Sequence, residues 1–160
     1  MIIHPIEPVY DKNSEILILG SFPSVKSREE MFFYGHPQNR FWRVLAVLYD
    51  APVPASTEEK RHFLLGHGIA LWDDIGSCDI EGSSDSTIKN VIPNDISRIL
   101  DYANIKAIFV NGKTAARYYN KYIKELVCRD AVVLPSTSPA NAAWRLERLV
   151  EAWKEIKEVR

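Results

Sequence analysis

The feature that most constrains the fold is a run of four apolar residues at positions 16–19 (ILIL), which Gly20 closes. An unbroken run of isoleucine and leucine is typical of a strand that is buried on both faces of a sheet. Residues 68–75, 105–110 and 131–134 contain similar apolar runs. We therefore expect about four strands, with helices covering both faces of the sheet that they form.

Helical patterns occupy the segments between these runs. Apolar residues recur at helical spacing within 38–49, and Ser56 with Glu59 has the spacing of a capping box at a helix start. Strands that alternate with helices predict an α/β fold: a three-layer α/β/α sandwich with a central parallel sheet of about four strands, in a single domain over residues 1–160. The other expected helices cover residues 26–33, 96–102, 113–126 and 141–159, and residues 76–87 are expected to form a long loop.

The composition narrows the class of protein. At 160 residues the chain is long enough for one sizeable core. Its two cysteines, Cys78 and Cys128, are too few for an iron–sulfur cluster or an all-cysteine zinc site, and no secretory leader or long apolar run is present. We expect a cytoplasmic monomer that uses no metal and no other cofactor and has no contact with a membrane.

The motifs of several enzyme classes are missing from the sequence. It has no phosphate-binding loop of the Gly-x-x-x-x-Gly-Lys-Ser/Thr type, and the turn after residue 19 lacks the spaced glycines of a dinucleotide site. The four histidines are scattered, so no two of them form a metal-ligand pair. No serine lies in a Gly-x-Ser-x-Gly elbow, which argues against a serine hydrolase.

Polar residues follow each of the four expected strands. They occupy positions 20–24, 73–74, 111–112 and 135–138. The carboxyl ends of parallel strands share one edge of the sheet, where ligands bind in folds of this kind. Amides, hydroxyls, aromatic rings and two aspartates suit the binding of a flat polar ring, such as a nucleobase, better than they suit nucleophilic attack.

A further polar segment, residues 34–42 (YGHPQNRFW), leads into an expected helix. Pro37 fixes its own φ and biases His36 away from the helical region, while Gly35 permits backbone angles that other residues resist, so this loop should hold one shape. Asn39 then lies near the helix start. Its side chain either caps the helix or is directed at a ligand from a rigid frame.

Three segments together resemble a known family. They are residues 20–24 (GSFPS), 34–42 (YGHPQNRFW) and 134–138 (LPSTS). In this order, and at strand ends, they resemble the uracil-DNA glycosylase superfamily. The chain is most similar to its hypoxanthine-DNA (deoxyinosine) glycosylase branch, with the mismatch-specific uracil-DNA glycosylases as second relatives. The resemblance extends from the first strand to the last helix.

This resemblance implies a base pocket and a catalytic residue. Gly20, Ser21, Phe22 and Pro23 match the loop that activates water, but most relatives have an asparagine or aspartate where this chain has Phe22. The hypoxanthine branch instead uses the asparagine of its Asn-Arg-Phe-Trp segment, which corresponds to Asn39. That amide would orient a water molecule or stabilise the transition state.

The resemblance also implies residues that contact the flipped base. Tyr34 matches an aromatic position that stacks on the base, although a core tyrosine would show the same pattern. Trp72 and Asp73 align with the position that reads the edge of uracil in other branches. An aspartate would accept a hydrogen bond from N1–H of hypoxanthine; Asp73 or Asp74 could equally cap the loop that follows.

The implied DNA contacts lie in two loops and one helix start. The segment after the fourth strand matches a loop that grips phosphates and wedges into the minor groove, although a proline-serine turn before a helix would look alike. The implied DNA-binding residues are Ser24, Pro135, Ser136, Thr137, Ser138 and Arg145.

The function implied is that of a monofunctional DNA glycosylase in base excision repair. It would hydrolyse the N-glycosidic bond of a flipped deaminated base in damaged DNA, with hypoxanthine favoured over uracil or xanthine. Two other classes stay open at this point. One is a non-catalytic binder of nucleobases or DNA, because Phe22 replaces the usual activating residue, and the other is a hydrolase of free nucleosides.

Overall fold

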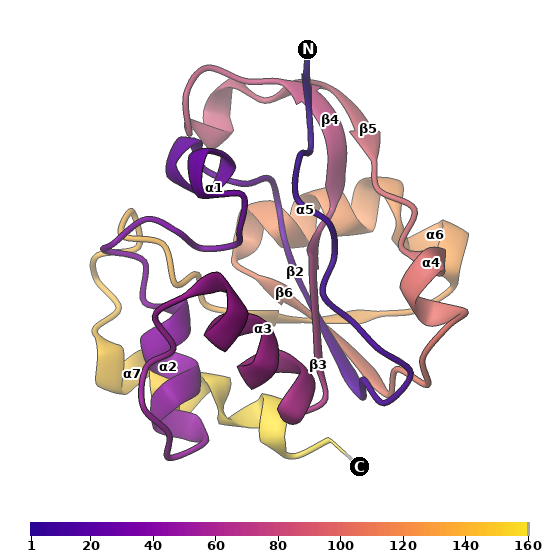
Figure 1. The fold of residues 1–160 in the computed structure, drawn as a ribbon. Helices are drawn as coiled ribbons and strands as arrows, with labels where there is room; N and C mark the ends of the chain where they lie inside the picture. The colour runs from indigo at the N-terminus through magenta and orange to yellow at the C-terminus, as the bar shows by residue number, and fades with distance from the viewer. Residues whose placement is uncertain (160) are drawn as a thin grey trace.

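The structure of the protein, a computed structural model, describes residues 1–159. Its centre is a four-stranded parallel sheet, as the apolar runs predict (Figure 1). The strands lie in the order β3-β2-β6-β7, and every residue of the central strand β2 is buried. Their bounds are Ile16–Gly20 for β2, Ile69–Asp73 for β3, Ala107–Asn111 for β6 and Ala131–Leu134 for β7.

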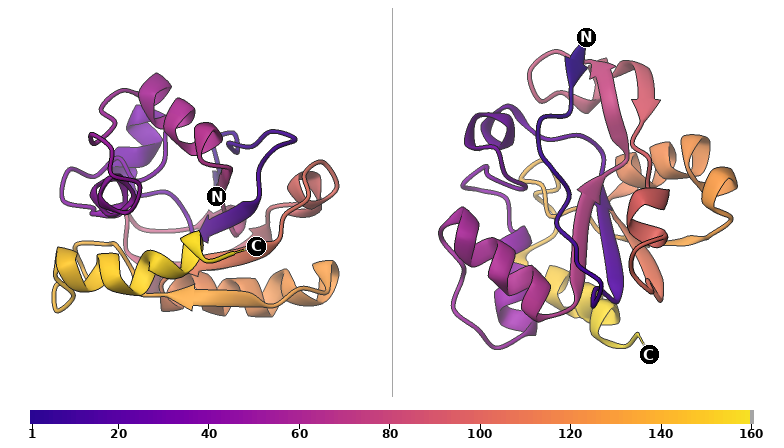
Figure 2. Two further views of the ribbon diagram at one scale, coloured as in Figure 1. Left: turned by 90° about the horizontal axis from the view of Figure 1, so that it is seen from below. Right: turned by 45° about the vertical axis from the view of Figure 1, so that its right-hand side comes forward.

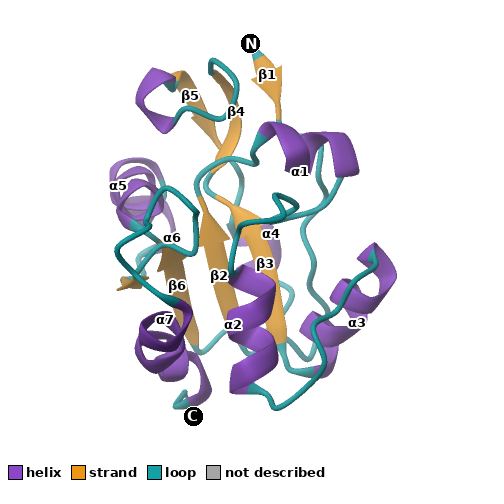
Figure 3. Ribbon diagram, turned by 90° about the vertical axis from the view of Figure 1, so that its left-hand side faces the viewer, coloured by secondary structure: helices purple, strands orange, loops and turns teal. Residues whose placement is uncertain are grey.

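Helices cover both faces of this sheet, which confirms the expected three layers (Figures 2 and 3). In Figure 3, α2 lies in front of the parallel strands and α4 lies behind them. Helices α2 and α7 pack on each other, with the rings of Phe41 and Trp153 in edge contact at 5.8 Å. The helices are α1 Val25–Glu30, α2 Phe41–Leu48, α3 Thr57–Gly66, α4 Ser97–Leu100, α5 Lys113–Tyr122, α6 Lys124–Val127 and α7 Leu146–Trp153, followed by a 3-10 turn over Lys154–Lys157.

The last helix is shorter than its sequence pattern predicts. It was expected from residue 141, but α7 begins at Leu146. The chain turns before it: the backbone N–H of Asn141 donates to the carbonyl of Ser138, and the Asn141 side chain donates to the carbonyl of Ser136. Local bonds of this kind compete with helix formation.

A second, antiparallel sheet was not expected. It consists of β1 (Ile2–Ile3), β4 (Ile75–Asp79) and β5 (Lys89–Pro93), in the order β1-β4-β5. The expectation of a loop over residues 76–87 is therefore wrong for its first four residues. β4 continues the path of β3 beyond the parallel sheet and pairs with both neighbours (Figure 1).

The N-terminal segment runs antiparallel along β3 and β4. Val9 exchanges two backbone hydrogen bonds with Leu71, at 3.0 and 2.8 Å, and the His4 backbone N–H donates to the Gly76 carbonyl at 2.8 Å. This pairing carries His4 to the carboxyl end of β3. Among residues 1–159, no helix has the length and apolar character needed to cross a bilayer.

Candidate active site

A pocket of about 380 Å³ opens at the carboxyl ends of β2, β3 and β6. This is the edge at which the polar strand ends were expected to meet. Tyr34, His36 and Asn39 from one loop and residues 136–140 from another complete its wall. The structure brings together most of the residues that the sequence singles out: Gly20, Ser21, Phe22, Pro23, Ser24, Tyr34, Asn39, Asp73, Ser136, Thr137 and Ser138 all line the pocket.

Asn39 lies one residue before Arg40, the N-cap of α2, and its side chain both bonds the start of this helix and lines the pocket. Its side-chain oxygen Oδ1 accepts a hydrogen bond of 2.9 Å from the backbone N–H of Phe41, the first residue of α2. The same Oδ1 accepts a second bond, of 2.8 Å, from the Thr137 hydroxyl. Asn39 is therefore not the N-cap residue itself, but its oxygen holds the start of α2 while the side chain remains part of the pocket wall.

Thr137 connects Asn39 to the end of β6. The Thr137 side chain is fully buried, and its hydroxyl accepts a 3.0 Å bond from the amide of Asn111. The Asn111 side-chain oxygen in turn accepts the backbone N–H of Thr137 at 3.1 Å. This close approach requires Gly112, whose φ is +95° and where a Cβ would lie 2.9 Å from the Ser136 Cβ.

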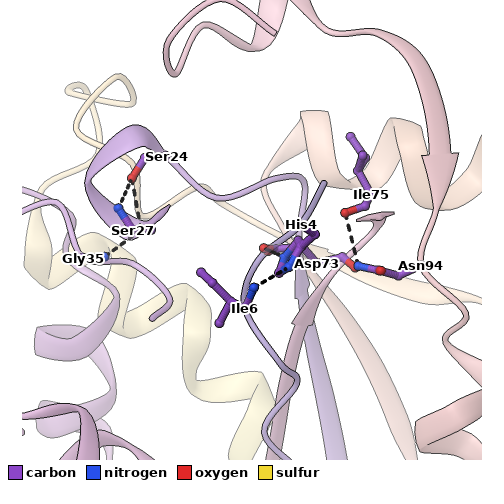
Figure 4. A network of polar contacts seen from close by, with 8 residues as sticks. All are labelled: His4, Ile6, Ser24, Ser27, Gly35, Asp73, Ile75 and Asn94. Carbon is purple, nitrogen blue, oxygen red and sulfur yellow. Dashed lines mark hydrogen bonds and ion pairs between the residues drawn. The ribbon is translucent and has the colours of Figure 1, made fainter. Parts of the chain in front are cut away.

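Asp73 is held by His4 across 69 positions of sequence. The His4 Nε2 lies 2.8 Å from Asp73 Oδ2, and both side chains are almost fully buried (Figure 4). His4 Nδ1 accepts the backbone N–H of Ile6 at 3.2 Å, so Nε2 carries the proton and donates to the carboxylate. The rings of Phe22 and Trp72 pack edge-on against the imidazole. The second carboxylate oxygen, Oδ1, is directed toward Gly20.

The absence of a side chain at Gly20 leaves room for the Asp73 carboxylate. A Cβ at Gly20 would lie 2.5 Å from Asp73 Oδ1 and 2.9 Å from the Tyr34 hydroxyl oxygen. Such contacts are too short for any real side chain. The two polar groups therefore converge on the one backbone position of β2 that has no side chain.

Comparison of the sequence with known families shows where the chain belongs. A family model described as the uracil DNA glycosylase superfamily matches residues 7–157. The chain belongs to the uracil DNA glycosylase superfamily.

Individual superfamily members resemble the chain over most of its length. A protein named hypoxanthine DNA glycosylase from Methanosarcina barkeri is 36% identical over 136 residues, which cover 84% of this chain and 85% of that protein. A second protein of the same name, from Methanosarcina acetivorans, is 34% identical and covers 98% of both chains. A solution NMR structure of a candidate uracil DNA glycosylase from Methanosarcina acetivorans has a TM-score of 0.79 and 31% identity, and it covers 98% of this chain and 99% of that one.

The backbone of Tyr34 has a conformation that is uncommon for a residue with a large side chain. Its φ is +53°, which costs a non-glycine residue energy and is typical of functional sites. One face of its ring stacks on Phe41, with centroids 4.1 Å apart, so only the other face can meet a base. Its hydroxyl is buried near the Asn111 amide without a hydrogen bond among residues 1–159. Burial raises the pKa of this phenol, and Asp73 raises it further, so it stays protonated.

Asp74 lies apart from the pocket, which separates the two aspartates that the sequence left as alternatives. Its carboxyl group is buried, does not line the pocket, and has no hydrogen-bond partner within the described chain. Burial raises the pKa of Asp74 well above its ordinary value, and the charge of Asp73 adds to the shift. Of the two aspartates, Asp73 is the one that lines the pocket.

Three residues singled out from the sequence do not line the pocket. Trp72 is buried behind it, in contact with His4, and Pro135 accepts a bond from the indole of Trp153. Arg145 is exposed at the start of α7. Trp72 therefore supports the pocket wall in this structure and does not form it.

Several pocket residues were missed. His36, Asn111, Lys113 and Thr114 line the pocket, and His4 supports it from behind. Asn111 was expected at this edge from its position at the end of a strand, but no role in the pocket was assigned to it. His4 gives no such signal, because an isolated histidine near the N-terminus has no motif or spacing.

Arg40 fixes the loop between β7 and α7. Its guanidinium donates to the backbone carbonyls of Thr137 (3.4 Å), Ser138 (2.8 Å), Asn141 (3.2 Å) and Trp144. Its own backbone N–H also donates to the Thr137 carbonyl, at 3.1 Å. One side chain thus shapes the whole loop that carries Ser136 to Ser138 into the pocket.

Proposed function

We propose that this chain is a DNA glycosylase that removes hypoxanthine from deoxyinosine in damaged DNA. The observation that carries the proposal is the pair of relatives named hypoxanthine DNA glycosylase, one of them covering 98% of the chain. The pocket supports it, because the three segments that resemble this branch of the superfamily converge there. Uracil and xanthine are secondary substrates, since each also presents an N–H beside a carbonyl.

The reaction adds water across the N-glycosidic bond. The bond between C1′ of the sugar and the base nitrogen breaks, its electron pair leaves with the base, and water supplies the hydroxyl that remains on C1′ and the proton that the released base takes up. A base in a duplex must first be flipped into the pocket. Asn39 is the catalytic amide, and Phe22 with the free face of Tyr34 contacts the flipped ring.

Asp73 is the proposed reader of the base edge. His4 occupies Oδ2, which leaves Oδ1 as an acceptor at the pocket floor. Hypoxanthine presents an N1–H donor to such an acceptor, whereas the N1 of adenine is itself an acceptor and would repel the carboxylate. The geometry therefore favours a deaminated purine over adenine. Gly20, Ser21 and Pro23 shape the pocket beside this carboxylate.

DNA contacts are proposed along the rim of the pocket. Ser136 and Ser138 offer hydroxyls there, and Lys113 lies beside them in the first turn of α5, where free backbone N–H groups favour phosphates. Ser24 caps α1 on the opposite rim, accepting from the backbone N–H of Ser27 (Figure 4). Pro135, Thr137 and Arg145 complete the proposed DNA-binding loop.

We further propose that the chain acts as a monomer and forms a single domain. Cys78 and Cys128 are both free thiols, which favours a reducing compartment, and we place the protein in the cytoplasm. The residues that the structure describes contain no group of His, Cys, Asp and Glu side chains arranged to hold a metal ion.

Base release from defined duplexes tests the proposal. Duplexes carrying a single deoxyinosine, deoxyuridine or deoxyxanthosine are incubated with excess protein, and abasic sites are cleaved with hot alkali. We expect strand breaks at deoxyinosine, fewer at the other two bases, and none at adenine. Turnover of free deoxyinosine without any cleavage of DNA would point to a nucleoside hydrolase. Failure to release any base would refute the proposal.

A further inference from the structure

The Asn39 amide stands at the end of a chain of directed hydrogen bonds. Asn111 Nδ2 donates to the Thr137 hydroxyl at 3.0 Å, and that hydroxyl donates to Asn39 Oδ1 at 2.8 Å. The Phe41 backbone N–H donates to the same Oδ1 at 2.9 Å. Thr137 is fully buried, so water does not compete for these bonds.

The direction of every bond in this chain is determined. The backbone N–H groups of Phe41 and Thr137 can only donate, so the atoms they meet, Asn39 Oδ1 and Asn111 Oδ1, must be oxygens. Asn111 therefore presents its NH₂ to Thr137, whose single hydroxyl proton is left for Asn39. Neither amide can be rotated by 180° without facing donor against donor.

These hydrogen bonds occupy both lone pairs of the Asn39 side-chain oxygen. A carbonyl oxygen has two lone pairs, and Oδ1 already accepts two hydrogen bonds. The Nδ2 group has no partner among residues 1–159, although the side chain lines the pocket. The part of Asn39 that a substrate can use is the N–H donor and not the carbonyl.

We propose that Asn39 acts as a hydrogen-bond donor to the departing base, and that Thr137 and Asn111 are positioning residues that fix its orientation. The inference deepens the proposed glycosylase function and rests on it. As the glycosidic bond breaks, its electron pair moves into the base and spreads over the ring nitrogens and O6. An N–H directed at this charge stabilises the transition state without reorganising. Orienting the attacking water is not the task of the Asn39 carbonyl.

Asn39→Asp separates the two roles. Aspartate is nearly isosteric, and its carboxylate can still accept from Phe41 and Thr137, but it has no N–H to donate. A carboxylate would also orient or deprotonate water at least as well as an amide carbonyl. If Asn39 served water through its oxygen, the aspartate variant would keep its activity.

The test is single-turnover cleavage of a deoxyinosine duplex at saturating enzyme, so that weaker DNA binding does not enter the rate. We expect Asn39→Asp to fall about 10²-fold or more, as far as Asn39→Ala, because both lack the donor. A rate for Asn39→Asp within tenfold of the parent protein would overturn the proposal. If the parent itself releases no hypoxanthine, the proposed function fails, and that result is distinct from either outcome.

Thr137 variants test the positioning role. Thr137→Val keeps the shape of the side chain but removes the hydroxyl, so the Asn39 amide loses one of its two hydrogen bonds. We expect the single-turnover rate to fall about tenfold, while the enzyme concentration that gives half the maximal rate changes little. Thr137→Ser restores the hydroxyl and should recover most of the rate. Thr57→Val, at an exposed position of α3, is the matched control. Equal rates for Thr137→Val and Thr137→Ser would contradict the positioning role, and the Asn39→Asp result stands even if Thr137→Val unfolds.

Discussion

At the scale of single residues, important polar groups of the pocket are held in place by hydrogen bonds to other residues of the chain. Asp73 has one oxygen bonded to His4 and the other directed at the space above Gly20. A buried carboxylate without a donor is strongly destabilised, so His4 both stabilises Asp73 and sets which of its oxygens is left without this bond. The sequence showed Asp73 at a strand end but gave no sign of its partner.

Variants of His4 test this arrangement. His4→Leu removes the donor, and we expect deoxyinosine cleavage to fall about tenfold or more because the Asp73 carboxylate loses its fixed orientation. His4→Gln supplies an amide donor of similar reach and should retain more activity. Single-turnover rates are compared at a temperature where thermal unfolding curves show both variants to be folded. Equal activity of the leucine and glutamine variants would contradict a role for the hydrogen bond.

The buried carboxyl group of Asp74 gives a second residue-scale prediction. Its folded-state pKa is raised above the ordinary value of 3.8, so the unfolded chain ionises first as the pH rises. Between the two pKa values, the free energy of unfolding then falls by about 1.4 kcal/mol for each pH unit. An asparagine at position 74 cannot ionise, so Asp74→Asn should not show this fall in the free energy of unfolding.

The prediction concerns the pH dependence and not one stability value. The stability of Asp74→Asn relative to the parent should increase from pH 4 toward pH 7, measured by urea unfolding at each pH. Asp101→Asn, at an exposed position, removes the same formal charge and serves as control. A constant difference across this range would show that Asp74 ionises equally in both states.

At the scale of elements, the β7–α7 loop is held by Arg40 from the start of α2. The guanidinium donates to four backbone carbonyls of this loop. Hydrogen bonds to a charged group stabilise more than neutral ones, and removing the donor leaves these carbonyls unsatisfied. The segment Asn39-Arg40 therefore combines the amide that we propose to be catalytic with the residue that positions the loop beside it.

Arg40→Ala should lower the free energy of unfolding by about 2–3 kcal/mol, because the buried carbonyls lose their charged donor. Urea denaturation measures the change. Arg43→Ala, three residues along on the exposed face of α2, should change it by less than about 0.5 kcal/mol. Similar losses for the two variants would mean that the Arg40 contacts do not stabilise the loop.

At the scale of the whole molecule, the parts predicted from the sequence are those with a local signal. The buried run at residues 16–19 predicts β2, and the rule that ligands bind at the carboxyl edge of a parallel sheet brings Asn39 and Asp73 to one pocket. The antiparallel sheet was missed because the two isoleucines of β1 are too few to form a pattern and β5 is mostly exposed, so it lacks an apolar run.

The missed contacts share one physical cause. His4 reaches Asp73 across 69 residues, and Asn39 reaches Thr137 across 98, so neither pair has a spacing that a sequence pattern could reveal. Strand pairing brings His4 to Asp73, whereas Asn39 and Thr137 meet where two loops pack together. The segments of the superfamily indicated which residues lie at the site, whereas the direction of each hydrogen bond needed the structure.

The central claim is that the Asn39 side chain performs catalysis in a pocket that removes hypoxanthine from DNA. The most direct measurement is the single-turnover rate of hypoxanthine release from a deoxyinosine duplex by the parent protein and by Asn39→Ala, with the affinity for the same duplex measured in parallel. The account predicts a rate lower by about 10²-fold or more in the variant, with a smaller change in affinity. Equal rates of hypoxanthine release in the two proteins would contradict it.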